Sequence, residues 1–278
     1  MRNLEEINQM RVVYQMPHME QVRVRKDIVY KTVAAEKLQM DVYYPPEMAS
    51  QTPHPAVLLV HGGSQATSIK HIKESGPYVS WGQLIAASGL IAVMFKHRTD
   101  EGYTRLHDAG SDVDALIHYV RDNSASLGID AERLGICAFS QGTIHGLPGV
   151  LRDTPAYIRC IVAYYGGMGL LNPRYFHFPV EEAELAREFS PVYHLRQVDA
   201  SRVAPIFIAK AGKDRPFLNE ALDEFIGVAN ERNIPITFMN HPHGEHGFDI
   251  LNDDARSQEI IKATLAFLAE HLKQQDDI

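Results

Sequence analysis

The chain has 278 residues, a formal net charge of −8 and two cysteines. This length allows one large α/β domain or two smaller ones, and the acidic balance argues against nucleic acid or an anionic membrane surface as the main partner. The first ten residues lack the apolar core of a signal peptide, and no apolar run reaches membrane-spanning length. We therefore expect a cytoplasmic globular protein.

The first part of the chain predicts an antiparallel hairpin. Residues 21–32 and 37–44 show polar–apolar alternation and many β-branched side chains, and a short turn at 33–36 separates them. Two prolines, Pro45 and Pro46, end the second strand. Residues 1–19 fit a short helix followed by an arm, which the sequence does not place against the rest of the chain.

Beyond the hairpin, short apolar runs alternate with amphipathic stretches. Strands are predicted at 56–60, 90–95, 134–139, 158–164, 204–211 and 234–240, and helices at 81–88, 108–123, 143–151, 217–230 and 257–272. This alternation predicts an α/β fold: a mostly parallel sheet with helices on both faces. Cys137 and Cys160 lie in two of the apolar runs, so we expect two buried, reduced and inert thiols.

One segment, 168–200, breaks the alternation. It contains several aromatic residues and prolines, followed by a Glu-rich stretch at 180–189 that favours a helix. We expect a small cap insertion whose aromatic side chains shape an acyl or alcohol pocket. The alternative is a surface excursion that packs on the body of the protein. The predicted organisation is a single domain over 1–278 with this insertion.

The strand at 134–139 runs directly into Ser140, and a helical stretch begins after Gly142. A serine at such a sharp strand-to-helix turn is the pattern of a nucleophile elbow, which holds the hydroxyl out at the edge of the sheet. The residues two before and two after the serine must be small, and here they are Ala138 and Gly142. The alternative is a buried strand that ends in a polar turn.

Three further polar stretches follow strand ends. They are His61-Gly62-Gly63-Ser64, Gly212-Lys213-Asp214, and the loop that contains His246. The carboxyl ends of parallel strands meet at one edge, so we expect these groups to lie near Ser140. A serine needs a base, a histidine supplies one, and a carboxylate fixes its tautomer. The paired glycines offer backbone N–H groups to an oxyanion, although a plain Gly-rich turn would look the same.

Together these motifs resemble the α/β-hydrolases, most closely the serine esterase branch that includes dienelactone-hydrolase-like and acetyl-esterase-like proteins. The resemblance extends from about Gln21 to Leu272. It implies an α/β-hydrolase fold with Ser140 as nucleophile, Asp214 as the acid member and His246 as the base. It also implies an oxyanion hole from backbone N–H groups of Gln141 and of the Gly63–Ser64 region.

The chain departs from the family pattern at two positions. Ala138 stands where glycine is usual, and Ser64 stands where many relatives have a third glycine, which leaves open which N–H completes the hole. Dienelactone hydrolases proper use cysteine as the nucleophile, so Ser140 argues against that activity.

Other residues compete for each role. His241 and His243 lie close to His246, which is preferred because Gly247-Phe248 follows it, as in the family. A metal site would need a carboxylate or thiol cluster at ligand spacing, which the sequence lacks. The remaining candidates fit structural or solvated positions: Lys96, His97, Arg98, Asp112, Asp114, Glu181, Glu182 and Glu184.

The expected function is hydrolysis of small carboxylic esters through an acyl-enzyme, without a metal or organic cofactor. A peptidase or amidase could use the same residues, although oligopeptidases of this fold usually carry a large extra domain for which this chain has no room. A non-catalytic binding scaffold is the other alternative, and such proteins often lack a triad residue. The sequence does not indicate an oligomeric state, and a homodimer would be ordinary.

Overall fold

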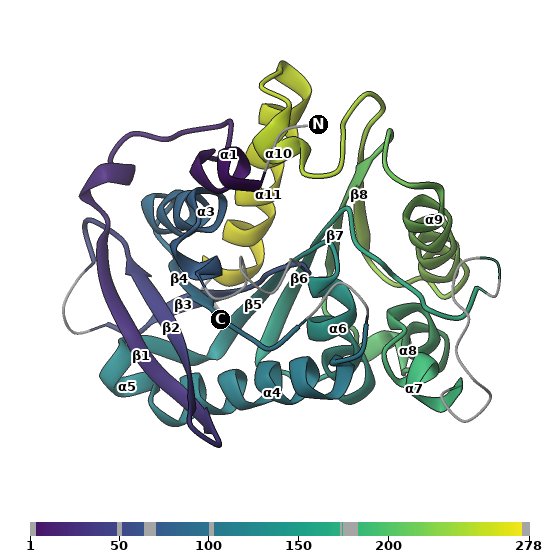
Figure 1. The fold of residues 1–278 in the computed structure, drawn as a ribbon, viewed down its shortest axis with the longest axis horizontal. Helices are drawn as coiled ribbons and strands as arrows, with labels where there is room; N and C mark the ends of the chain where they lie inside the picture. The colour runs from purple at the N-terminus through teal and green to yellow at the C-terminus, as the bar shows by residue number, and fades with distance from the viewer. Residues whose placement is uncertain are drawn as a thin grey trace.

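The computed structural model describes residues 4–48, 52–63, 71–99, 103–172, 174 and 183–273. Its centre is a twisted eight-stranded sheet with the order β1-β2-β4-β3-β5-β6-β7-β8 (Figure 1). The strands are β1 (Arg23–Val33), β2 (Glu36–Tyr44), β3 (His54–Val60), β4 (Ile91–Phe95), β5 (Ile129–Phe139), β6 (Ile158–Tyr164), β7 (Ile206–Ala211) and β8 (Ile236–His241). The β1–β2 hairpin is antiparallel and β2 pairs antiparallel with β4, whereas all other neighbours are parallel.

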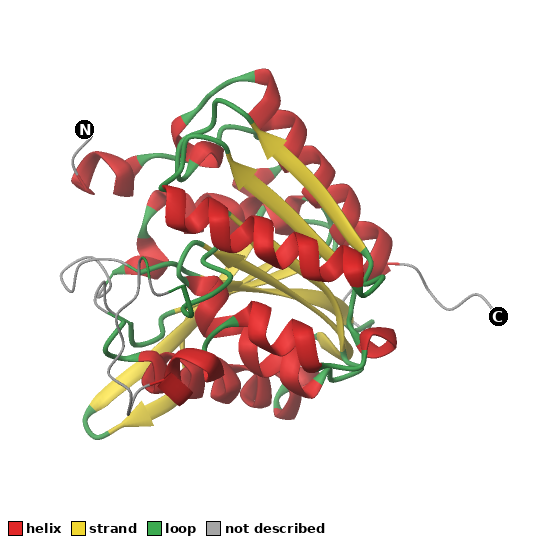
Figure 2. Cartoon of the chain, turned by 90° about the vertical axis from the view of Figure 1, so that its right-hand side faces the viewer, coloured by secondary structure: helices red, strands yellow, loops and turns green. Residues whose placement is uncertain are grey.

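Helices cover both faces of the sheet, so that it lies between two layers (Figure 2). One layer holds α3 (Gly76–Ala87) and α11 (Ala255–Lys273), with α1 (Leu4–Gln9) and α10 (Phe248–Leu251) beside them. The other layer holds α4 (Leu106–Asp122), α6 (Gly142–Asp153), α8 (Pro191–Gln197) and α9 (Pro216–Glu231), with α5 (Ser124–Leu127) and α7 (Ala183–Glu188). None of the helices described is long and apolar enough to span a membrane.

The central strands read as continuous apolar runs because both of their faces are covered. In β3, Leu58 points into the core beneath α4 and α6, and Leu59 points into the core beneath α3 and α11. Both side chains are almost fully buried. The same double coverage buries Cys137 on β5 and Cys160 on β6 as free thiols, and burial raises the pKa of both, which makes them poor nucleophiles.

The predicted hairpin and the strand–helix alternation are confirmed, and two element boundaries differ from the prediction by more than two residues. Helix α3 begins at Gly76, not at residue 81, because Pro77 occupies its first turn, where a missing N–H costs nothing. Strand β5 begins at Ile129, not at residue 134, because the charged residues Asp130, Glu132 and Arg133 hide the start of the strand.

The N-terminal arm, which the sequence does not place, is fixed against the α3 layer. A Cβ at Gly76 would collide with the carbonyl oxygen of Met10, so arm and helix are in direct backbone contact. The backbone N–H of Val12 donates to Ser80 Oγ (2.9 Å), and that of Val13 donates to the carbonyl oxygen of Asp249 (2.8 Å). The arm therefore connects α3 to α10.

The segment 168–200 is described in part. Helix α8 buries Val192 and Leu195 in the core shared with α6 and α9, so this helix belongs to the body of the protein. The expected helix at 180–189 is described as α7, over Ala183–Glu188. The aromatic run at 175–178 lies outside the described residues, and the cap therefore stays a prediction.

Candidate active site

Ser140 occupies the sharp turn between β5 and α6. Its φ is +52°, a left-handed conformation that is strained for a residue with a side chain and is typical of a nucleophile elbow. The turn is tightly enclosed: a Cβ at Gly142 would collide with the carbonyl oxygens of Val60 and His61. Ala138, the departure from the family pattern, sits in the buried sheet between β3 and β6, where its single methyl group is accommodated.

A hydrogen-bonded relay joins the three residues predicted as the triad. His246 Nε2 lies 2.8 Å from Ser140 Oγ, and His246 Nδ1 lies 2.6 Å from Asp214 Oδ2. The side chain of Asp214 is 1% exposed and that of His246 is 30% exposed, so the imidazole reaches solvent while the carboxylate does not. The residues are 106 and 32 positions apart in sequence and meet because each follows a strand at the same edge of the sheet.

The backbone around Asp214 fixes its carboxylate. At the end of β7, the N–H of Gly212 donates to the carbonyl oxygen of His241, and the N–H of Lys213 donates to that of Gly244. The second carboxylate oxygen of Asp214 accepts the backbone N–H of Arg215 at 2.8 Å. Both oxygens are thus engaged, one by the imidazole and one by the main chain.

The His61-Gly62-Gly63 loop lies beside the elbow. A Cβ at Gly62 would come within 3.0 Å of the Ser140 Cβ. The N–H of Gly62 donates to the Tyr78 hydroxyl (3.0 Å), and His61 Nδ1 bonds to the carbonyl oxygen of Gly62 (2.7 Å). Of the other residues expected at an oxyanion hole, Gly63 and Gln141 line the space around Ser140, and Ser64 lies outside the described residues.

Behind this loop, His61 stacks on His97 with ring centroids 3.6 Å apart and planes within 8°. Both rings are fully buried, and burial holds the pKa of each well below its ordinary value, so both are neutral. The backbone N–H of His97 lies 3.3 Å from His61 Nε2. The stacked pair supports the His61-Gly62-Gly63 loop through these contacts, which agrees with the structural role expected for His97.

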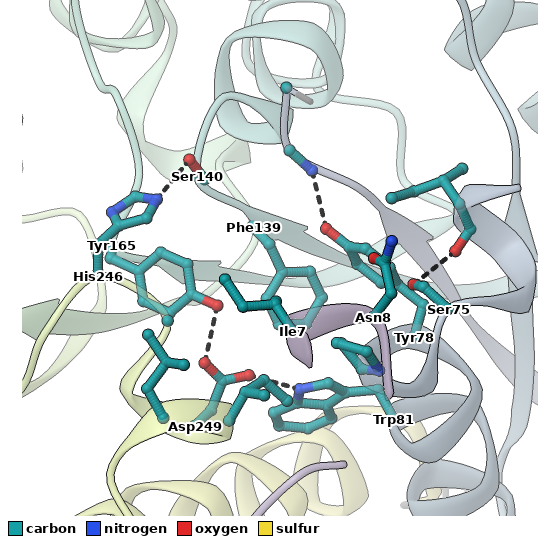
Figure 3. Close-up of a pocket in the computed structure, with 17 residues that line it drawn as sticks. Ile7, Asn8, Ser75, Tyr78, Trp81, Phe139, Ser140, Tyr165, His246 and Asp249 are labelled. Carbon is teal, nitrogen blue, oxygen red and sulfur yellow. Dashed lines mark hydrogen bonds between the residues drawn. The ribbon is translucent and has the colours of Figure 1, made fainter. Parts of the chain in front are cut away.

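Two cavities meet at Ser140, Gly63 and His246. The first, of about 270 Å³, is mainly apolar and is shown in Figure 3. Its walls include Ile7 from α1 and Trp81 from α3. At its base, the buried carboxylate of Asp249 accepts hydrogen bonds from Trp81 Nε1 and from the Tyr165 hydroxyl, both at 2.7 Å. Burial raises the pKa of Asp249.

The second cavity, of about 430 Å³, lies on the other side of the triad. Its lining includes Gly167, Gly169 and the apolar side chains of Ile144, Leu170 and Leu218. Arg215 also lines it and places Nη2 at 3.4 Å from His246 Nε2. The two cavities therefore both reach Ser140 and His246, but the first contains the Asp249 carboxyl group and the second contains the Arg215 guanidinium.

The rivals for the triad lie elsewhere. His241 is buried, and its Nε2 bonds to Asp254 and Ser257, while His243 is exposed. Asp112 forms buried ion pairs with Lys31 and Arg98, which confirms a structural role for Asp112 and Arg98. Lys96 forms an ion pair with Glu36, and Asp114 lines a separate cavity beside α4. Glu184 lies on α7, whereas Glu181 and Glu182 lie outside the described residues.

Among the residues that contact the triad or line its cavities, sequence reasoning missed Ile7, Tyr165, Arg215 and Asp249. Tyr165 packs its ring 4.7 Å from that of His246 and follows the end of β6, so its position at a strand end was a usable signal. Arg215 follows Asp214 directly, and Asp249 follows His246 by three residues. Ile7 gave no signal, because it reaches the site only through the docking of the N-terminal arm.

The chain is similar to a known family and to several solved structures. The BD-FAE family model matches residues 40–153. Native esterase Est2 from the planctomycete Thermogutta terrifontis matches with a TM-score of 0.73 and 18% identity, covering 98% of this chain and 100% of that one. The butyrate-bound form of the same esterase matches with a TM-score of 0.71 and 18% identity, covering 93% and 98%.

A truncated carbohydrate esterase from gut microbiota also matches, with a TM-score of 0.72 and 19% identity over 91% of this chain and 97% of that one. No curated protein sequence matches the chain significantly. The sheet order and the shared structures of these esterases lead to one conclusion: the chain has the α/β-hydrolase fold.

Proposed function

We propose that the protein is a serine esterase that hydrolyses carboxylic esters through an acyl-enzyme. The observation that carries this proposal is the continuous relay from Ser140 Oγ through the His246 imidazole to the buried Asp214 carboxylate. Its chain order, Ser then Asp then His, is that of the α/β-hydrolase triad. The matched esterases support the same reaction class.

In the first half-reaction, Ser140 Oγ attacks the ester carbonyl carbon while His246 Nε2 takes the hydroxyl proton. Asp214 holds the Nδ1–H, which keeps the Nε2 lone pair directed at the serine and stabilises the imidazolium that forms. His246 then donates its proton to the alkoxide oxygen as the ester C–O bond breaks. The alcohol leaves, and the acyl group remains on Ser140.

The tetrahedral intermediate requires donors for its oxyanion. We assign these to the backbone N–H groups of Gln141, at the start of α6, and of Gly63. The N–H of Gly62 is bonded to Tyr78, which favours Gly63 as the donor from the loop. In the second half-reaction, His246 activates a water molecule that attacks the acyl-enzyme, and the acid product is released with Ser140 restored.

The apolar cavity supports a small acyl group. Its volume is about 270 Å³, and apolar side chains form most of its walls. The matched Est2 structures are described as butyrate-bound and propionate-bound, which supports the same size class here. The second cavity would then receive the alcohol portion, with Gly169 and Leu170 from the segment proposed as a cap on its wall.

The test is hydrolysis of p-nitrophenyl esters from acetate to octanoate by the wild type beside Ser140→Ala. We expect the substitution to lower kcat by on the order of 10⁴-fold or more, as in other triad knockouts. A fluorophosphonate probe should label the wild type at Ser140 and leave the variant unlabelled. Equal turnover by both proteins would refute the proposal, and so would labelling at another residue.

A further inference from the structure

The side chain of Arg215 occupies an unusual position, in contact with the base of the triad. Its Nη2 lies 3.4 Å from His246 Nε2, the same nitrogen that accepts the Ser140 hydroxyl. Its Nε lies 3.6 Å from Asp214 Oδ1, and the side chain is 56% exposed. The guanidinium is thus anchored at the triad on one side and open to the second cavity on the other.

In the ester hydrolysis proposed above, this position of Arg215 disfavours the protonated form of His246. When His246 takes the serine proton, the imidazolium stands next to a permanently charged guanidinium. Among the described residues, Asp214 is the one acidic side chain in direct contact with both His246 and Arg215, and one carboxylate cannot neutralise two positive charges. A second negative charge on the Arg215 side of the triad would remove the repulsion.

The second cavity has room for a group that carries such a charge. It has a volume of about 430 Å³, and its described lining is otherwise glycine backbone and uncharged side chains. Arg215 is the one fully charged residue among the described residues that line it, and none of these is acidic. The first cavity differs, since the buried Asp249 carboxyl group at its base would oppose an anion.

The leaving oxygen of the ester must approach His246 Nε2 to receive its proton. Arg215 lies beside the same nitrogen, so a carboxylate attached to the leaving alcohol comes within reach of the guanidinium, which can bind it through two parallel N–H donors. We propose, resting on the esterase function above, that the preferred substrates are esters whose alcohol portion carries a carboxylate, and that Arg215 binds this group.

A matched pair of esters tests this proposal: phenyl acetate and 3-carboxyphenyl acetate. We expect the wild type to prefer the carboxylate ester in kcat/KM by tenfold or more, corrected for the spontaneous rates of the two esters. Arg215→Gln should reduce this ratio at least tenfold, mainly through KM for the anionic ester. The preference should also shrink as salt is raised, because the paired charges are partly exposed.

Two further variants isolate the contact. Lys213→Gln removes an equal charge two residues away, outside both cavities, and should leave the ratio unchanged. Arg215→Glu should invert the preference and favour 3-(trimethylammonio)phenyl acetate over the carboxylate ester. An equal loss in Lys213→Gln and Arg215→Gln would overturn the proposal, because it would show a general field effect instead of a specific contact.

Binding to the inactive Ser140→Ala variant separates this inference from the esterase proposal. By calorimetry, 3-carboxyphenyl acetate should bind at least tenfold more tightly with Arg215 present than with Arg215→Gln, a difference of about 1.4 kcal/mol. Arg215-dependent binding without turnover by the wild type would refute the esterase and retain the carboxylate site. Turnover of phenyl acetate with no preference for the carboxylate would retain the esterase and refute the site.

Discussion

The two cavities at Ser140 differ in how they are built. The first is lined by apolar side chains from α1 and α3, with the hydrogen-bonded Asp249 carboxyl group at its base. The second is larger and exposes glycine backbone and the Arg215 guanidinium. A triad alone does not decide which way round an ester binds. In the proposed function, the contrast in charge and polarity between the two cavities supplies that direction and places the acyl group in the apolar one.

The largest expected effect is on kcat, and it should distinguish the buried carboxylate of Asp214 from that of Asp249. Asp214→Asn should lower kcat by about 10⁴-fold, because an amide no longer favours the tautomer with a free lone pair on His246 Nε2. Asp249→Asn should lower kcat by less than about tenfold, since Asp249 bonds to Trp81 and Tyr165 and not to the imidazole. Steady-state kinetics on p-nitrophenyl acetate measure both values, and similar losses in the two variants would contradict this division of roles.

Asp249 should instead matter for stability. In Asp249→Asn a single amide oxygen replaces the two carboxylate oxygens that accept from Trp81 Nε1 and from the Tyr165 hydroxyl, so one of these two buried hydrogen bonds is lost or reversed. We expect the free energy of unfolding to fall by about 1–3 kcal/mol in urea denaturation. Asp253→Asn, at an exposed position just after α10, is the control and should change the free energy of unfolding by less than about 0.5 kcal/mol.

The apolar cavity can be filled without changing the triad. Ile7→Trp places a large ring in its wall and should lower the ratio of kcat/KM for p-nitrophenyl octanoate to that for the acetate by about tenfold. Leu170→Trp fills the other cavity and should leave this acyl-chain profile as in the wild type. If Leu170→Trp changed the acyl profile and Ile7→Trp did not, the assignment of the two cavities would be reversed.

The smallest effect is a pH dependence of stability. Because burial raises the pKa of Asp249, the folded state holds its proton more tightly than the unfolded state does. Its contribution to stability is complete below the ordinary carboxyl pKa of about 3.9 and declines as pH rises through the raised value. The stability of the wild type relative to Asp249→Asn should therefore fall with rising pH in this interval, by no more than about 1.4 kcal/mol per pH unit. Urea titrations at several pH values measure it, and a rising difference would contradict the shift.

The residues of the relay could be predicted because local signals identify them. Ser140 is flanked by small residues at a strand end, and Asp214 and His246 follow strands in the expected order. Since parallel strands share one edge, sequence order was enough to bring them together. The long β5 and the early start of α3 were missed because polar residues and a proline masked them.

The environment of the triad was not predictable in the same way. Arg215 reaches His246 through its side-chain torsions, which no periodicity in the sequence encodes. Ile7 reaches the cavity only because the arm docks on α3, and the signal for that docking is a glycine at residue 76 that reads as an ordinary loop residue. Such contacts depend on tertiary packing, which the local pattern of residues does not specify.

The docked arm gives the apolar cavity a wall that can open independently of the sheet. Helix α1 has only six residues, too few to be stable alone, whereas Val12 and Val13 are fastened by backbone hydrogen bonds to Ser80 and Asp249. Amide hydrogen exchange should therefore be rapid in α1, slow at Val12 and Val13, and slowest in β3 and β5. Opening of α1 alone would widen the acyl side and leave the relay intact, so the range of acyl groups accepted would depend on a local folding equilibrium.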